Sequence, residues 1–308
     1  MFKGMNSQFK RYFDFTDEVN IALENNRPVV ALESTLISHG FPYPQNYEIA
    51  QEMESIIREY DVVPATMALI NGRIKVGLSK SELKFMATSD KIFKVSRRDM
   101  ASIVAQKLNG ATTVAATMII AEMVGIKIFA TGGIGGVHRG AESSFDISAD
   151  LQELSRTSVA VVCSGAKAIL DLELTREYLE TMGVPVIGFR CEEMPAFYCR
   201  ESGLEVDYQV DDAIGAANII RVMKNLGLGG GMLITNPVPV EDAISMEYMN
   251  KIIEKAVQEA NRKGIVGKKI TPYLLNKVKE LTSGKSLKAN IALVKDNARV
   301  AALIAREL

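Results

Sequence analysis

The stretch PVVALE at residues 28–33, followed by QNYEIAQEMESIIREY at residues 45–60, is the clearest indication of the fold class. The first segment is a short apolar run that ends in a carboxylate, which is typical of a buried strand. The second segment carries Ile49, Met53 and Ile57 at helical spacing and therefore predicts a helix. A buried strand followed by a helix is the repeating unit of a parallel sheet covered by helices.

The same unit recurs along the chain. Further strands are predicted at residues 92–95, 126–131, 159–163, 184–189 and 232–235, and helices near 98–108, 112–124, 166–182 and 211–224. After about residue 240 the pattern is helical only, over 241–263, 271–282 and 286–307. This alternation predicts an α/β/α fold, with a mostly parallel central sheet, helices on both faces and a helical C-terminal segment. We expect residues 25–308 to form a single catalytic domain after an N-terminal extension over residues 1–24.

Composition excludes several classes of protein. The formal net charge of the 308 residues is −1, which provides no basic field for a nucleic acid. Cys163, Cys191 and Cys199 are odd in number and lack CxxC spacing, so we expect reduced thiols. The sequence has neither a run of about 18 apolar residues, as a membrane span requires, nor the apolar core of a secretory signal. We therefore expect a cytoplasmic protein with a small-molecule substrate and no nucleic-acid or membrane partner.

Ionisable side chains gather where the predicted strands end, which is where open parallel sheets bind ligands. Glu33 ends the first strand and Lys94 falls in the strand at 92–95. An ionisable residue in an apolar strand is costly unless it is paired or functional. These two residues, with Arg97 and Arg98 after the second strand, therefore predict one charged cleft. A structural ion pair or a strand-end charge that reaches solvent is the alternative for Glu33 and Lys94.

Lys167 is a candidate nucleophile. It follows the strand at 159–163 across a turn of small residues, Ser164-Gly165-Ala166, which would bring its amine close to a ligand. Desolvation or a neighbouring cation such as Lys94 would favour the neutral amine that a nucleophile requires. A lysine on the surface of a helix is the alternative.

The glycine-rich loop at residues 132–136 does not fit a nucleotide-binding motif. From Gly133, the third glycine of GxGxxG would fall at position 138, which is a histidine. The Gly284-Lys285-Ser286 segment would need an earlier Walker glycine at position 279, which is a lysine. We therefore expect no nucleotide cofactor. His138 could contact a phosphate or the edge of a base, or it could have a purely structural role.

Asp146 and Asp150 flank Ser148 in the segment that follows. Carboxylate oxygens and water are the usual ligands of hard cations, so one of these residues could hold Mg²⁺ or Mn²⁺. Helix capping by Ser148 or Asp150 is the alternative.

Long strings in these loops resemble the pseudouridine-5′-phosphate glycosidase family, which is also described as indigoidine synthase A-like. The most specific are ALESTLISHGFPYPQN at 31–46, KVSRRD at 94–99, FATGGIGGVHRGA at 129–141, FDISADLQEL at 145–154 and VCSGAK at 162–167. The resemblance extends from about residue 25 to the end of the chain.

The resemblance implies reversible conversion of pseudouridine 5′-phosphate and water to uracil and ribose 5-phosphate. It implies that Glu33 is the general acid that assists opening of the ribose ring. Lys167 would attack C1′ and form an imine with the ring-opened sugar, and Lys94 would contact the sugar phosphate. Because a C–C glycosidic bond has no heteroatom leaving group to protonate, the two-carboxylate mechanism of O-glycosidases does not transfer to this reaction.

The resemblance also implies the remaining site residues and the partners. Asp146 would hold one divalent ion per subunit, Mn²⁺ with Mg²⁺ as the alternative, and the protein would be a homotrimer. The residues expected to line the substrate pocket are Val114, Ser148, Ala149, Asp150, His138 and Asn290. Two other functions stay open: a sugar-phosphate aldolase, and a regulatory protein that binds a sugar phosphate without turnover.

Overall fold

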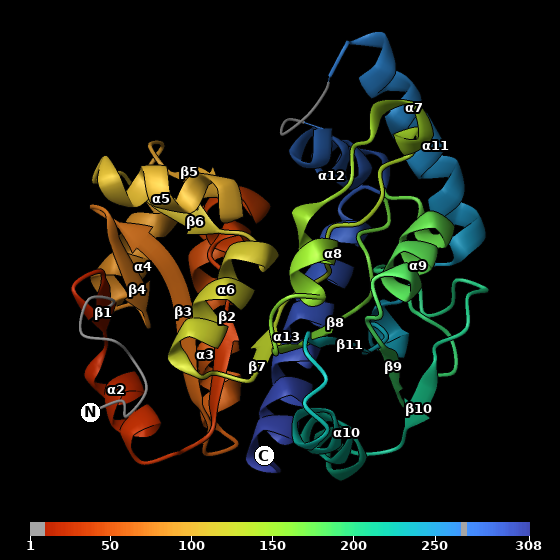
Figure 1. The fold of residues 1–308 in the computed structure, drawn as a ribbon. Coiled ribbons are helices and arrows are strands. Elements are labelled where there is room, and N and C mark those ends of the chain that lie inside the picture. The colour runs from red at the N-terminus through yellow and green to blue at the C-terminus, as the bar shows by residue number, and fades with distance from the viewer. Residues whose placement is uncertain (1–9, 266–269) are drawn as a thin grey trace.

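A computed structural model describes residues 10–265 and 270–308 of the chain, and Figure 1 shows its fold. Seven parallel strands form the central sheet. In spatial order they are β3 (Val63–Ile70), β2 (Val29–Leu32), β7 (Ile128–Ala130), β8 (Ala160–Cys163), β11 (Met232–Thr235), β9 (Val186–Phe189) and β10 (Tyr208–Val210). The predicted α/β/α class with its mostly parallel sheet is confirmed.

Four further strands extend the sheet around β3. β4 (Arg73–Val76) pairs antiparallel with β3, and β1 (Phe13–Phe15) pairs parallel with β4. β6 (Gly110–Thr112) pairs antiparallel with β3, and β5 (Phe93–Val95) pairs parallel with β6. In Figure 1 these strands and β2 form the lobe with the red to yellow N-terminal half of the chain.

Helices cover both faces of the sheet, because successive crossovers leave the sheet in opposite directions. They are α2 (Asp17–Glu24), α3 (Gln45–Arg58), α4 (Lys80–Thr88), α5 (Arg97–Ala105), α6 (Val114–Val124), α7 (Ala141–Ser144), α8 (Ala149–Leu154), α9 (Leu172–Thr181), α10 (Ala213–Asn225), α11 (Met246–Arg262), α12 (Ile270–Leu281) and α13 (Lys285–Arg306), with a π-helix η1 (Leu36–Gly40) and a 3₁₀ helix η2 (Val240–Asp242). The chain passes from β2 through α3 to β3, and from β7 through α8 to β8 in the opposite direction. Because both crossovers are expected to be right-handed, α3 and α8 cover opposite faces. α13 packs on α3, and α6 packs on α8.

The C-terminal segment is helical, as predicted. α13 contacts β2, β7 and β8 as well as α3, and most of its inward side chains are fully buried. This helix therefore closes one face of the sheet beneath the loops that carry the predicted site. Among the described residues, no helix is both long and apolar enough to cross a membrane.

Several elements differ from the sequence prediction. β3 was not expected, although all eight of its residues are buried and it is the longest strand of the sheet. The helix expected from residue 166 begins only at Leu172, because residues 164–170 form an irregular loop. Part of the N-terminal extension expected over residues 1–24 is integrated into the fold, since β1 joins the sheet and Val19 of α2 is fully buried.

Candidate active site

The sheet has a topological switch point between β2 and β7. These strands are neighbours, but the chain runs from β2 to β3 on one side and from β7 to β8 on the other. Loops that leave in opposite directions open a crevice at the carboxyl ends of the two strands, and this is where such sheets bind ligands. Glu33 directly follows β2 and Thr131 directly follows β7, so both residues lie at the crevice.

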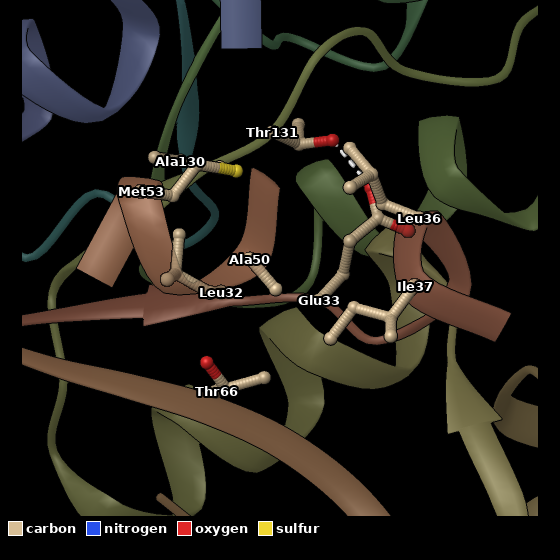
Figure 2. Close-up of a pocket in the computed structure, with 9 residues that line it drawn as sticks. All are labelled: Leu32, Glu33, Leu36, Ile37, Ala50, Met53, Thr66, Ala130 and Thr131. Carbon is tan, nitrogen blue, oxygen red and sulfur yellow. Dashed lines mark hydrogen bonds between the residues drawn. The ribbon is translucent and has the colours of Figure 1, made fainter. Parts of the chain in front are cut away.

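Glu33 is held in this crevice by a hydrogen bond to Thr131. The Thr131 hydroxyl donates to its carboxyl group, as Figure 2 shows. Burial raises the pKa of Glu33 above the usual carboxyl value, and the positive charge of Lys167 and the Thr131 bond oppose this shift only in part. A carboxyl group whose pKa is raised holds its proton more readily, and it is suited to donate that proton as a general acid.

A small cavity lies beside Glu33 on the side of the sheet core. Its volume is about 10 Å³, close to the space that one water molecule needs. Three of its lining residues, Glu33, Thr66 and Thr131, carry a polar group, and the other six are apolar. In Figure 2, Thr66 on β3 and Thr131 lie on opposite sides of this space.

Lys167 reaches the crevice from the loop after β8. Its backbone N–H donates to Ile134 O at 3.1 Å, and the residue is half-buried. Gly165 in this loop has φ +79°, and an added Cβ would lie 2.1 Å from Pro195 O, so only glycine fits there. The charge of Lys167 acts on the pKa of both Glu33 and His138. The structure therefore brings the predicted acid and the predicted nucleophile within electrostatic range of each other.

Lys94 lies at the same site, although β5, the strand that carries it, is antiparallel to the strands of the central sheet. β6 is antiparallel to β3, so the carboxyl ends of β5 and β6 meet the carboxyl end of β2 from the opposite direction. Two bonds join these ends: Thr112 N–H donates to Ser34 Oγ at 2.9 Å, and the Thr35 hydroxyl donates to Thr112 O at 2.8 Å. The charge of Lys94 contributes to the pKa of Glu33.

The two arginines predicted near Lys94 have other surroundings. Arg97 forms a charged pair with Glu153 of α8, whose side chain is 1% exposed, and one N–H donates to Glu153 Oε2 at 2.7 Å. The Arg98 side chain is 73% exposed. Arg97 therefore ties α5 to α8 instead of serving as a free cation of the cleft, and for Arg98 the expectation stays a prediction.

Asp150 organises the backbone around the crevice. Its carboxylate is buried and accepts from Ala115 N–H at 2.9 Å and from Gly135 N–H at 2.8 Å. The first of these amides lies at the N-terminus of α6, where a negative charge is favourable. Val114, the first residue of that helix, is buried behind it.

Ser148 and its neighbours form the start of α8. The Ser148 hydroxyl is the N-cap of this helix and accepts from Asp150 N–H at 3.3 Å, which bears out the capping alternative for this residue. Ala149 is exposed. The segment thus lies along the glycine loop after β7, and its predicted contact with substrate stays a prediction.

A methyl group at position 135 would disrupt this arrangement. A Cβ added to Gly135 would lie 2.2 Å from Ser148 Oγ and 2.8 Å from Asp150 Oδ2. We therefore expect Gly135→Ala to lower the free energy of unfolding by about 1–3 kcal/mol, as overpacking does, and to reduce activity. Denaturant unfolding measures the first effect. Gly229→Ala, which meets no atom within 4 Å, is the control, and equal stability of both variants would contradict the close packing at residue 135.

His138 and Asp146 lie together at the outer edge of the site. The His138 backbone N–H donates to the backbone oxygen of Asp146 at 3.0 Å, and both residues are half-buried. Burial lowers the pKa of His138, as do the charges of Lys94 and Lys167, while Asp146 opposes the shift. Among residues 10–265 and 270–308, no three His, Cys, Asp or Glu side chains gather as a metal site. The donor set at Asp146 is thus a single carboxylate, which fits a hard cation that keeps most of its water ligands.

A second, larger cavity adjoins the crevice. Its volume is about 300 Å³, and it lies between η1, α12 and α13. Asn290 lines it together with His39, and Asn290 Oδ1 would lie 3.5 Å from a Cβ on Gly132, in the loop after β7. Asn290 therefore lies in a cavity beside the loop after β7, and this cavity is large enough for part of a small substrate. A contact between Asn290 and substrate stays a prediction.

Asn297 is a site residue that the sequence analysis missed. It is fully buried on α13, and its amide N–H groups donate to Thr131 O at 2.9 Å and Ser164 Oγ at 3.2 Å. Its oxygen accepts from Asn236 at 3.1 Å. The Asn297 side chain therefore holds two loops in place: the loop after β7, which carries Thr131, and the loop after β8, which carries Lys167. The signal was present in the sequence, because an amide on the apolar face of an amphipathic helix predicts a buried hydrogen-bonding role.

Loss of the Asn297 amide should loosen the loops that follow β7 and β8. We expect Asn297→Ala to lower the free energy of unfolding by about 3 kcal/mol, because it leaves buried polar groups on three loops unpaired. Thermal or denaturant unfolding measures the effect. The exposed Asn225→Ala is the matched control, and similar stability of the two variants would show that Asn297 does not hold the loops.

A carboxyl group of raised pKa and a lysine at the switch point of an open parallel sheet are typical of an α/β enzyme that acts on small molecules. A family model described as indigoidine synthase A like protein matches residues 18–307, and the chain belongs to this family. The resemblance inferred from the loop strings is thus confirmed.

Individual relatives cover nearly the whole chain. A pseudouridine-5′-phosphate glycosidase of Caldanaerobacter subterraneus subsp. tengcongensis is 63% identical over 298 residues, 97% of each chain. One from Petrotoga mobilis is 58% identical over 296 residues, 96% of this chain and 97% of that one. Among solved structures, the prealnumycin C-glycosynthase in complex with ribulose 5-phosphate superposes with a TM-score of 0.90 at 39% identity, over 97% of each chain. An indigoidine synthase A-like protein of Thermotoga maritima superposes with a TM-score of 0.85 at 38% identity, over 91% of this chain and 92% of that one.

Proposed function

We propose that this protein is a pseudouridine-5′-phosphate glycosidase that acts through a lysine imine. The observation that carries the proposal is the arrangement at the switch point, where a carboxyl group with a raised pKa lies within electrostatic range of a lysine. The names of the close relatives and the sugar-phosphate complex of the C-glycosynthase support the same substrate class.

The first step would open the ribose. The Lys167 amine attacks C1′ as the C1′–O4′ bond breaks, and Glu33 donates its proton to O4′. The nitrogen bonded to C1′ then loses a proton to the Glu33 carboxylate, and its freed electron pair forms C1′=N as the bond from C1′ to the uracil carbon breaks. That carbon takes up a proton, and uracil leaves. Hydrolysis of the imine by water releases ribose 5-phosphate and restores the amine.

The remaining site residues would bind and orient the substrate. Lys94 would bind the anionic sugar phosphate, and His138 and Asn290 would line the pocket. The segment 148–150 and Val114 would form the wall of the site next to the glycine loop. Asp146 would hold a divalent ion, Mn²⁺ or Mg²⁺, and such an ion orients water and polarises substrate oxygens when bound. The protein would work in the cytoplasm as a homotrimer.

A product assay tests the function. The protein is incubated with pseudouridine 5′-phosphate, and uracil and ribose 5-phosphate are quantified. We expect both in equal amounts. An aldolase would instead cleave a C–C bond within a sugar phosphate, and a regulatory protein would bind ribose 5-phosphate without turnover. Binding without release of uracil would contradict the proposal.

A further inference from the structure

Asn297 of α13 can hold two loops of the site only when its amide group points in one direction. Its nitrogen donates to Thr131 O at 2.9 Å and to Ser164 Oγ at 3.2 Å. If the amide were turned around, its oxygen would face the carbonyl oxygens of Thr131 and Gly132, and two acceptors form no hydrogen bond. The direction of this buried amide therefore decides whether the loops are held.

Asn236, which directly follows β11, sets that direction from the other side. Its amide nitrogen donates to Asn297 Oδ1 at 3.1 Å and to Asp296 Oδ2 at 2.8 Å. A carboxylate can only accept hydrogen bonds, so Asp296 requires the nitrogen of Asn236, and not its oxygen, on this side. That nitrogen in turn requires the oxygen of Asn297, which leaves the Asn297 nitrogen to face the loops.

Asp296 is anchored where this series of groups approaches the surface. Arg299, three positions further along α13, donates from Nε to Asp296 Oδ1 at 2.7 Å. The side chains of Arg299 and Asp296 are 38% and 22% exposed, whereas the residues Asn236 and Asn297 are 5% and 0% exposed. Hydrogen bonds between charged groups are stronger than those between neutral ones. The ion pair therefore fixes one end of the series, and the two amides lie where water cannot compete for their hydrogen bonds.

The two loops that Asn297 contacts are also bonded to each other. Ser164 N–H donates to Gly132 O at 2.9 Å, and Lys167 N–H donates to Ile134 O at 3.1 Å. These bonds continue the parallel pairing of β7 with β8 beyond the ends of the two strands. A shift of the loop after β7 would therefore move the loop that carries Lys167 as well.

We propose that Asp296 is a positioning residue, which acts through the two asparagines to hold the side chains of Glu33 and Lys167 at the separation that the reaction needs. The inference rests on the proposed function. The Thr131 hydroxyl donates to the Glu33 carboxyl group, and the Thr131 carbonyl oxygen accepts from Asn297. The acid and the nucleophile follow different strands but have to act on one sugar, and a misplacement of about 1 Å can lower a rate roughly a hundredfold.

Asp296→Asn tests this role, because it keeps the size of the side chain but allows the group at this position to donate as well as accept. The Asn236 amide can then turn around, and the Asn297 amide loses the donor that fixes it. We expect kcat for uracil release to fall roughly tenfold with little change in KM. Borohydride trapping of ribose 5-phosphate on the protein should slow by the same factor.

A double variant shows whether Asp296 acts through Asn297. In the Asn297→Ala background, Asp296→Asn should lower kcat by less than about twofold, because the amide that Asp296 orients is already gone. A full further loss in the double variant would mean that the two residues act independently, and would overturn the inference. Wild-type kcat in the single variant Asp296→Asn would overturn it too.

Glu52→Gln is the matched control for a general weakening of α13. Glu52 of α3 pairs with Lys295, the residue before Asp296, at 2.5 Å. Glu52→Gln and Asp296→Asn each remove one ion pair of this helix, so denaturant unfolding should show similar, small changes in stability. Glu52→Gln should keep the wild-type kcat and trapping rate, and an equal loss of kcat in both variants would contradict the positioning role. Wild-type protein that releases no uracil would instead contradict the proposed function itself.

Discussion

Lys167→Ala should abolish turnover, with a loss of roughly a thousandfold or more in kcat, because the amine that forms the covalent intermediate is gone. The variant should still fold, since Lys167 is half-buried and its described backbone bonds do not need the side chain. Borohydride reduction in the presence of ribose 5-phosphate should trap an adduct on the wild-type protein and none on the variant. Intact mass spectrometry measures both.

A second lysine variant controls for nonspecific modification. Lys127 is exposed and directly precedes β7. It therefore lies at the amino end of this strand, whereas the crevice lies at the carboxyl end. Lys127→Ala should form the adduct as the wild-type protein does. An adduct of unchanged yield in Lys167→Ala would remove Lys167 from the nucleophile role and leave the function without its covalent step.

Glu33→Gln should lower kcat by about 10²–10⁴, the usual contribution of a general acid, with a much smaller effect on ribose 5-phosphate binding. Glutamine keeps the shape and accepts the Thr131 bond but has no proton of the required acidity. Steady-state kinetics and a binding titration separate the two effects. Loss of binding with normal turnover would make Glu33 a positioning residue.

The pH dependence of this step has a defined sign. Because Glu33 acts in its protonated form and burial raises its pKa, kcat should fall as the pH rises through that raised value. The Thr131 bond lowers the pKa of Glu33, so Thr131→Val should move this fall to higher pH. If the dependence of kcat on pH were the same in Thr131→Val as in the wild-type protein, Glu33 would not be the group that causes it.

Stability should depend on pH in the same direction. The folded protein holds a proton on Glu33 that the unfolded chain releases at lower pH, because the folded-state pKa is raised. Its contribution is present below the ordinary carboxyl pKa and is lost as the pH rises through the raised value. Glu33→Gln should reduce this loss and keep stability at neutral pH, although the variant is inactive.

The fold class was predictable because buried parallel strands are short apolar runs separated by helical patterns. β2, β7, β8, β9 and β11 have this form. β3 was missed because Pro64 interrupts its apolar run and no helix follows it directly. Pro64 is the second residue of β3 and pairs with Val30 of β2, whereas β4 and β6 pair with β3 only from Met67 onward. Proline within a run argues against a central strand, but it is tolerated near the start of a strand where the other side is unpaired.

The candidate site was only partly predictable. Glu33, Lys94 and Lys167 were identifiable because charges are unusual next to apolar strands. It was not predictable that these three residues lie close together, because the order of strands in a sheet depends on contacts between distant segments. The Glu33–Thr131 bond spans 98 positions, and the bond from Asn297 to Thr131 spans 166. The antiparallel approach of β5 likewise depends on pairing that no local pattern contains.

The proposed mechanism requires a covalent bond between Lys167 and an opened pentose within reach of Glu33. A crystal of the protein soaked with ribose 5-phosphate would reveal this bond. We expect continuous electron density from Lys167 Nζ to C1′ of an open-chain sugar, with the Glu33 carboxyl group beside the sugar oxygen released by ring opening. A closed ribose ring bound in the crevice, with its C1′ unattached and distant from Lys167, would contradict it.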